Sequence, residues 1–262
     1  GEIEDLLHDN LRLGARRGSR MHNTQINMFH KDGHLVTNGE VADAYLRAYD
    51  VGEECGCIST FEVHVNMWSE DFRRVAEVAS LVENRGVPYR MTMDHSHVIF
   101  KIDNPREQEV LDIRPAVESG ELKLSPYEDG NVIDAWIDGG WVWHCHARAA
   151  APNNPKNIWA EHPDGSVGRG IQYPFIQPRP GEYHSDWDEK NLEAWKEAIR
   201  RLMKYLLEND ASPLGQVSTE FIPATDYGMG NKYSIFEHSV ACATWLRQTW
   251  NDPVSYTHLT LP

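Results

Sequence analysis

The sequence contains few cysteines, and their spacing suits neither disulfides nor a zinc knuckle. Only Cys55, Cys57, Cys145 and Cys242 occur among the 262 residues. Cys55 and Cys57 are too close to pair comfortably with each other, the other two are isolated, and no CxxC pair is present. A disulfide-stapled framework is therefore excluded. Because free thiols persist in reducing compartments, we expect a cytoplasmic protein.

Basic clusters and long apolar runs are also missing. The formal net charge is −15, and the densest basic stretch is the short run of Arg16, Arg17 and Arg20. A surface of this charge repels a phosphate backbone, which argues against nucleic acid as a partner. No run of about 18 apolar residues and no signal peptide is present, so we expect no membrane span. The expected partner is a small polar molecule, and a homo-oligomer stays open.

The two ends of the chain look unnatural. The sequence begins at Gly1, and its last stretch, "PVSYTHLTLP", resembles translated sequencing adaptor. We therefore expect a single domain over residues 1–252, cut from a longer protein, and a non-native tail over residues 253–262. With 40% hydrophobic residues, the chain can bury one substantial core.

Strand-like and helix-like segments alternate along the chain. The strand-like segments cover residues 20–29, 57–65, 89–94, 141–148 and 216–221. The helix-like segments cover residues 38–56, 69–86, 186–210 and 234–250. Asn38 and Ser69 are the expected N-caps of the first two helices. The alternation predicts a parallel sheet covered by helices, and five strands fit a (β/α)8 TIM barrel that lacks its N-terminal strands. A doubly wound open sheet is the competing arrangement, but no GxGxxG follows the first strand.

Acidic and imidazole side chains occur at the ends of four strand-like segments. They are Glu62 and His64, then Asp94 with His97, then His144, His146 and Arg148, and finally Glu220. Residues two apart on a strand share a face, and the carboxyl ends of barrel strands meet at one mouth. Carboxylates gathered there would repel each other without a cation between them. The pattern predicts a site for Mn²⁺, Co²⁺, Mg²⁺ or Zn²⁺.

Each of these residues also has a simpler interpretation. Asp94 could cap a turn, Glu220 could pair with a basic side chain, and the histidines could stack on nearby tryptophans. The agreement of four strand ends favours the metal site. Around it, the long irregular segment 149–186 is expected to shape the substrate pocket through Trp159, His162, Arg169 and Gln172. Trp68 and Trp143 are expected to stack on an apolar face of the substrate, and His22, His30 and His34 are expected to rim the pocket.

Over residues 20–250, the order of these motifs resembles the xylose isomerase-like TIM barrels, the sugar phosphate isomerase/epimerase group. The matching segments are "FEVH", the DxxH element Asp94–His97, "HCHAR", "GIQYP" and "STEFIP". The resemblance implies that Glu62, Asp94, His146 and Glu220 are metal ligands. It implies that His97 contacts substrate or a metal-bound water, and that Arg148 holds a substrate oxygen or phosphate. Many relatives end the third of these strands with His-x-Lys-Asp, whereas this chain has His146-Ala147-Arg148-Ala149, so His144 could replace His146 as the ligand.

The expected function is metal-dependent isomerisation or epimerisation of a sugar or sugar phosphate through an enediolate. Glu62 and Glu220 would remove and return the proton next to the carbonyl, while a metal ion stabilises the developing negative charge. One alternative is a metal-dependent lyase or dehydratase of an inosose-like or keto-acid substrate. Two others are a phosphodiesterase of the AP-endonuclease type, which the acidic surface disfavours, and a sugar-binding barrel without catalysis.

Overall fold

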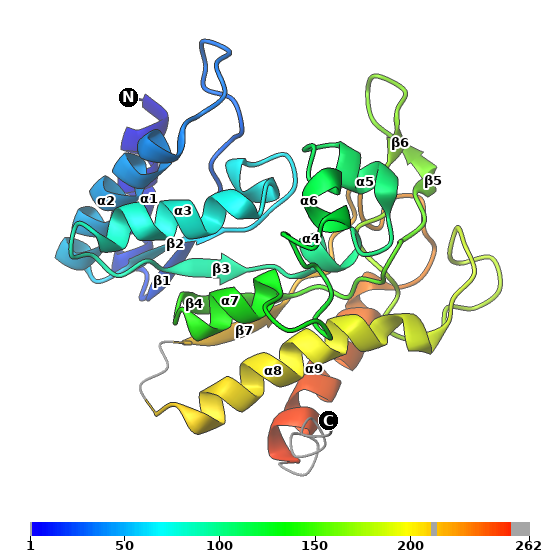
Figure 1. The fold of residues 1–262 in the computed structure, drawn as a ribbon. Coiled ribbons are helices and arrows are strands. Elements are labelled where there is room, and N and C mark those ends of the chain that lie inside the picture. Colours follow the sequence, from blue (N-terminus) through cyan, green and yellow to red (C-terminus); the bar gives the residue numbers. More distant parts are fainter. Residues whose placement is uncertain (1, 211–213, 253–262) are drawn as a thin grey trace. The chain divides into compact units, whose positions relative to one another are not determined.

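The structure is a computed structural model that describes residues 2–210 and 214–252 (Figure 1). The expected non-native tail, residues 253–262, lies outside the described residues. The chain divides into two compact units. The first unit runs to Met93 and also includes Gly140–His144, and the second comprises Asp94–Gly139 and the chain from Cys145 onward. All four cysteines are free thiols, as the sequence predicts.

The first unit alternates helices with short strands. Its elements are α1 (Glu2–Arg16), β1 (Met21–Thr24), α2 (Asn38–Cys55), β2 (Ile58–Glu62), the 3-10 turn η1 (Trp68–Glu70), α3 (Arg73–Glu83) and β3 (Met91–Met93). Strands β1 and β2 pair in parallel, as do β2 and β3. Helices α2 and α3 bury apolar faces that include Tyr45, Ala48, Val75 and Val78. This arrangement follows from helices that are apolar on one side only, and that side packs against the interior of the unit.

Two expected helix starts in the first unit are wrong. Helix α2 is capped by Thr37 and not by Asn38. The Thr37 side chain accepts the backbone N–H of Glu40, and the Glu40 carboxylate accepts the backbone N–H of Thr37, which together form a capping box. Ser69 caps no helix, because its hydroxyl donates to the backbone carbonyl of Glu62 at 2.8 Å. The chain therefore forms η1 first, and α3 begins only at Arg73.

The second unit contains most of the helices and the long irregular segment. Its elements are α4 (Ser96–Ile99), α5 (Pro105–Glu109), α6 (Arg114–Glu118), α7 (Val132–Asp138), β5 (Asn157–Glu161), β6 (Val167–Gly168), η2 (Glu189–Leu192), α8 (Glu193–Glu208), β7 (Gln216–Thr219) and α9 (Ile235–Asn251). Strand β4 (Val142–Ala147) contributes residues to both units. The sheet has five strands in the order β1-β2-β3-β4-β7. The fold is therefore a mixed α/β fold, as predicted.

The segment 149–186 is tied to a second loop, residues 221–233, by many polar contacts. The side-chain amide of Asn157 donates to the backbone carbonyls of Thr225, Tyr227 and Met229, at 3.2, 3.3 and 2.9 Å. Backbone bonding adds to this, since Ile171 N donates to the carbonyl of Asp226 at 2.8 Å. The segment also contains the antiparallel pair β5–β6. What the sequence predicts as an irregular loop is thus held in place along much of its length.

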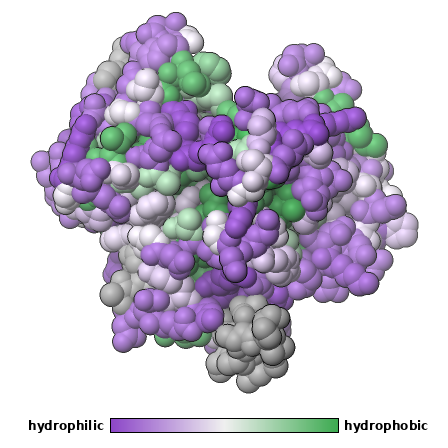
Figure 2. Space-filling view, in the orientation of Figure 1, coloured by the Kyte–Doolittle hydropathy of each residue, from purple (hydrophilic) through white to green (hydrophobic). Residues whose placement is uncertain are grey.

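The surface agrees with the acidic, hydrophilic composition. Hydrophilic residues cover most of the face seen in Figure 2, and apolar residues form only small patches there. Within residues 2–210 and 214–252, no helix combines the length and the apolar character needed to cross a membrane.

Candidate metal centre

Three of the expected metal ligands lie together in the second unit. Asp94 directly follows β3, His146 lies near the end of β4, and Glu220 directly follows β7. Each offers one ligand atom, and these atoms lie within 4.8 Å of one another. We call these three residues and Arg148 the acidic centre. Donor atoms around one cation each lie about 2.1 Å from it, so no two of them are more than about 4.2 Å apart. The three side chains would therefore need to move only slightly closer together to bind one metal ion.

Asp94 is the most deeply buried acid of the centre, with 0% of its surface exposed. One carboxylate oxygen accepts the Ser96 hydroxyl at 2.5 Å and the Ser96 backbone N–H at 3.1 Å. This bonding turns the chain into α4 and fixes the orientation of the carboxylate. Burial alone would raise the pKa of Asp94, but the charges of Arg148, His97 and His146 outweigh it and hold the pKa well below its ordinary value.

Arg148 is the cation that pairs with both acids in this structure. Its side chain is 1% exposed, and one terminal nitrogen contacts Asp94 Oδ2 at 2.9 Å and also pairs with Glu220. Its Nε donates to the backbone carbonyl of Glu220 at 3.1 Å. The guanidinium carbon lies 4.3 Å from the centre of the Tyr227 ring. The pKa of Arg148 is raised, because the attraction of Asp94 outweighs the opposing effect of burial.

The charges of the acidic centre do not cancel. Two carboxylates against one guanidinium leave one negative charge, and the neighbouring side chains are imidazoles. His146 Nδ1 lies 3.2 Å from Glu220 Oε2, and His97 Nε2 lies 3.3 Å from Asp94 Oδ2. A buried net negative charge is unstable unless an imidazole takes a proton or a cation binds. Carboxylates and an imidazole are the donors that Mn²⁺, Co²⁺ and Zn²⁺ accept, so these residues fit a divalent metal.

Of the two histidines on β4, His146 lies nearer the two acids. His146 belongs to the cluster of ligand atoms with Asp94 and Glu220. His144 lies two residues earlier on β4 and is not part of that cluster. His97 is fully buried and lies within 3.4 Å of an Arg148 nitrogen, so it contacts the centre without belonging to the cluster of ligand atoms. The role of either residue toward a substrate stays a prediction.

Glu62, the fourth expected ligand, is the last residue of β2 in the first unit and is 1% exposed. Its Oε2 accepts the side-chain amides of Asn23 at 2.7 Å and Gln25 at 2.6 Å. These two amides lie two residues apart, at the end of β1. Neither amide was predicted from the sequence, although their alternation in "HNTQ" places them on one face of the strand. The prediction that Glu62 is a ligand stays a prediction.

Other expected substrate-binding side chains in the first unit have partners within the chain. Trp68 is 1% exposed, and the guanidinium of Arg74 lies over its ring. The ring of Trp143 is covered by Arg90, whose guanidinium carbon lies 4.3 Å from the ring centre. Nδ1 of His64 lies 2.6 Å from the carbonyl of Val65. A buried Trp68 has little surface to offer a sugar, so its expected stacking role would require local movement.

The oxygen and the nitrogen of the Gln172 side-chain amide both form hydrogen bonds within the chain. Its oxygen accepts the backbone N–H of Ile222 at 3.0 Å, and its nitrogen donates to the Tyr233 hydroxyl at 3.1 Å. Arg169 pairs with Glu107. These contacts make both side chains part of the framework that fixes the segment 149–186, and substrate binding by Gln172 stays a prediction.

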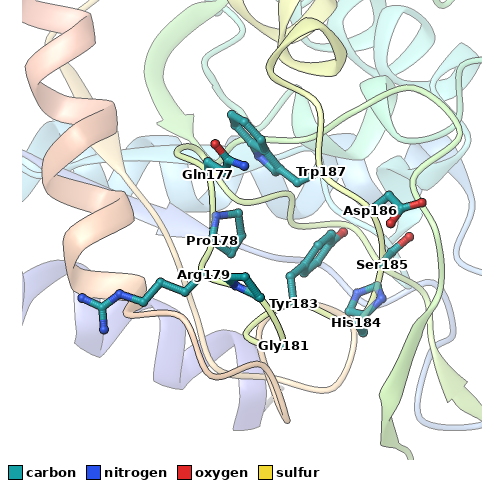
Figure 3. A pocket seen from close by; sticks show the side chains of 10 residues that line it. Gln177, Pro178, Arg179, Gly181, Tyr183, His184, Ser185, Asp186 and Trp187 are labelled. Carbon is teal, nitrogen blue, oxygen red and sulfur yellow. The ribbon is translucent and has the colours of Figure 1, made fainter.

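An open pocket lies at the end of the same segment (Figure 3). Its volume is about 550 Å³, and its lining residues lie between Gln177 and Trp187. Arg179 extends away from the other labelled side chains. The residues named from the sequence as shaping the pocket lie elsewhere in the segment. His162, for example, pairs with Asp226 at 2.9 Å. None of the lining residues belongs to the acidic centre.

Comparison with known proteins adds no further assignment. No family model matches this sequence, and a search of curated proteins finds no match either.

Proposed function

We propose that the protein is a metal-dependent isomerase or epimerase of a sugar or sugar phosphate, working in the cytoplasm. We further propose that its five-stranded sheet is part of a (β/α)8 barrel. The observation that carries the proposal is the acidic centre, where Asp94, His146 and Glu220 follow or end three separate strands. The resemblance in motif order supplies the reaction class and the class of substrate.

The proposal gives each residue of the centre a role. Asp94 and His146 would hold a divalent metal, which supplies Lewis-acid stabilisation of negative charge on a carbonyl oxygen. Glu220 is the proposed proton carrier, because its side chain is 29% exposed whereas Asp94 is fully buried. A proton carrier must reach the substrate, and a positioning ligand need not. Arg148 is 1% exposed, and the terminal nitrogen that the two acids leave lies 3.4 Å from His97 Nε2, so its proposed hold on a substrate oxygen or phosphate would require local movement.

A sugar-binding barrel without catalysis is the second candidate function. The ion pairs of Arg148 favour it, because an arginine that pairs with two acids leaves only one negative charge for a metal to balance. The two candidates differ in metal content: an enzyme of the proposed kind requires a divalent ion, and a binding module does not. A lyase acting on a keto-acid or inosose-like substrate would share the centre and differ only in the group that leaves.

The test combines metal analysis with turnover. The purified protein is assayed for bound Mn²⁺, Co²⁺, Mg²⁺ and Zn²⁺, and then screened colorimetrically with ketoses, sugar phosphates and keto-inositols. Glu220→Gln is compared with Glu161→Gln, which changes an exposed glutamate at the end of β5. We expect Glu220→Gln to lose turnover by at least about a hundredfold while folding normally, and Glu161→Gln to keep it. Full activity in Glu220→Gln would refute the proposal.

A further inference from the structure

A short loop in the first unit forms a closed turn between β1 and α2. Val36 N donates to the carbonyl of Met28 at 3.0 Å, and His30 N donates to the carbonyl of His34 at 2.9 Å. The turn closes through Gly33, whose N–H donates to the carbonyl of His30 at 2.8 Å. Gly33 has a φ of +91°, which is a conformation that glycine adopts readily. The backbone bonds hold residues 30 and 34 opposite each other.

The turn brings two imidazoles and a carboxylate together. Nδ1 of His30 lies 3.1 Å from Asp32 Oδ1, and Nδ1 of His34 lies 2.6 Å from the same oxygen. The two ring centres are 4.8 Å apart, with the ring planes at 30°. Ligand atoms of the three residues all lie within 4.8 Å of one another. Their side chains are 42–61% exposed, so a dissolved ion can reach them.

A fourth residue fixes one of the rings from its far side. Nε2 of His34 lies 3.0 Å from the carboxylate of Glu40. Glu40 is itself held by the Thr37 capping box at the start of α2. In proteins, a histidine that binds a metal through one nitrogen commonly donates its other N–H to a carboxylate, which fixes the tautomer and the ring orientation. Glu40 and His34 already have that arrangement.

The arrangement places two acceptors face to face. When His34 donates its Nε2 proton to Glu40, its Nδ1 lone pair points at Asp32 Oδ1 across 2.6 Å. Two acceptors at that distance repel unless a proton or a metal ion lies between them. His30 directs a second nitrogen at the same oxygen. Two imidazole nitrogens and one carboxylate oxygen form a donor set that suits Zn²⁺, Co²⁺, Ni²⁺ and Cu²⁺ better than Mg²⁺ or Ca²⁺.

We propose that His30, Asp32 and His34 form a second divalent-metal site, selective for Zn²⁺-like ions, with Glu40 as the residue that positions His34. The site lies wholly within the first unit and is independent of the acidic centre and of the proposed function. Exposed sites with three protein ligands leave positions for water. Metal binding would also stabilise the turn that precedes α2, because all three metal ligands belong to that turn.

Zinc titration of the whole protein tests the proposal, with two readouts. Calorimetry measures the number and affinity of Zn²⁺ binding events, and nitrogen NMR of ¹⁵N-histidine protein reports which ring nitrogens bind. The double variant His30→Ala/His34→Ala removes both imidazoles. The matched control is His162→Ala, which removes a partly exposed histidine that pairs with Asp226 at 2.9 Å. The control asks whether any surface His–Asp pair would bind zinc.

The expected result is a Zn²⁺ binding event that the double variant lacks and that His162→Ala retains, with direct Zn²⁺ shifts at Nδ1 of His30 and His34. Glu40→Gln keeps a residue able to complete the capping box but removes the charge, and we expect it to weaken Zn²⁺ binding about 10–100-fold. Asp32→Asn, which keeps the size of the side chain, should weaken binding as well. Identical isotherms for the wild type and the double variant, or no shift at the two Nδ1 atoms, would overturn the proposal.

Discussion

Replacing Arg148 with methionine is expected to destabilise the metal-free protein by about 3–5 kcal/mol, the range for removing one partner of a buried ion pair. Arg148 is 1% exposed and contacts both Asp94 and Glu220. Methionine fills much of the same volume, so the loss reports mainly the charge that is removed. The cost arises because Asp94, with 0% of its surface exposed, keeps its negative charge or must take up a proton in the interior.

Part of this loss belongs to a second interaction. The guanidinium lies 4.3 Å from the centre of the Tyr227 ring, and a desolvated cation–π contact contributes about 2 kcal/mol or more. The variant Tyr227→Leu keeps the ion pairs and removes this contact. In a double-mutant cycle, the coupling energy between Arg148→Met and Tyr227→Leu measures the cation–π share, and the rest of the loss in Arg148→Met belongs to the ion pairs and packing.

The assay is urea unfolding in EDTA, followed by circular dichroism, with Arg114→Met as the matched control. Arg114 also pairs with two acids, Glu109 and Glu118, but its side chain is 39% exposed. Water screens exposed ion pairs strongly, so the control should lose little stability. Equal losses in Arg148→Met and Arg114→Met would refute the reasoning that burial makes the acidic centre depend on its cation.

Three further predictions follow from other parts of the structure. Glu62→Gln should weaken Mn²⁺ or Zn²⁺ binding at least about tenfold in equilibrium dialysis if Glu62 is a ligand, and unchanged binding would remove it from the ligand set. Burial lowers the pKa of His238 to about 4, and its Nδ1 accepts the backbone N–H of Phe175 at 2.9 Å. The unfolded chain therefore binds a proton that the folded chain does not between about pH 6.5 and 4. Unfolding free energy should fall by about 2 kcal/mol, allowing for solvent screening, as pH drops through this window, and His238→Asn should flatten that slope in urea titrations. Gly170→Ala should lower the free energy of unfolding by at least about 2 kcal/mol. The reason is that a Cβ at this position would lie 2.0 Å from the carbonyl oxygen of Pro155, and that the φ of Gly170 is +78°. Thermal unfolding measures the loss, and an unchanged melting temperature would contradict the prediction.

The sequence predicts those parts of the fold in which apolar residues recur with one clear period. The spacing of Val75, Ala79 and Val82 indicates the helix that becomes α3, and these residues are buried as that spacing requires. The start of the helix could not be read from the sequence, because Ser69 bonds to Glu62 instead of to the helix. That bond depends on where β2 ends, which no local pattern shows.

The candidate site also contains residues that could be predicted from the sequence and residues that could not. Asp94, His146 and Glu220 could be named because each occurs where a β-prone run ends, and a parallel sheet brings such ends together. The pairing of Arg148 with both acids could not be foreseen, because arginine can reach several neighbours and the sequence does not select among them. Tyr227, which stacks on Arg148, lies in a loop without periodicity and gave no signal.

The side chain of Asn157 bears on how the second unit can move. Its amide nitrogen donates to the backbone carbonyls of Thr225, Tyr227 and Met229, and so joins the segment 149–186 to the loop 221–233. Segments fastened in this way cannot open separately, as an active-site lid would. Any ligand that shifts one loop must carry the other with it. Evolution or engineering of one loop is therefore constrained by the backbone of the other.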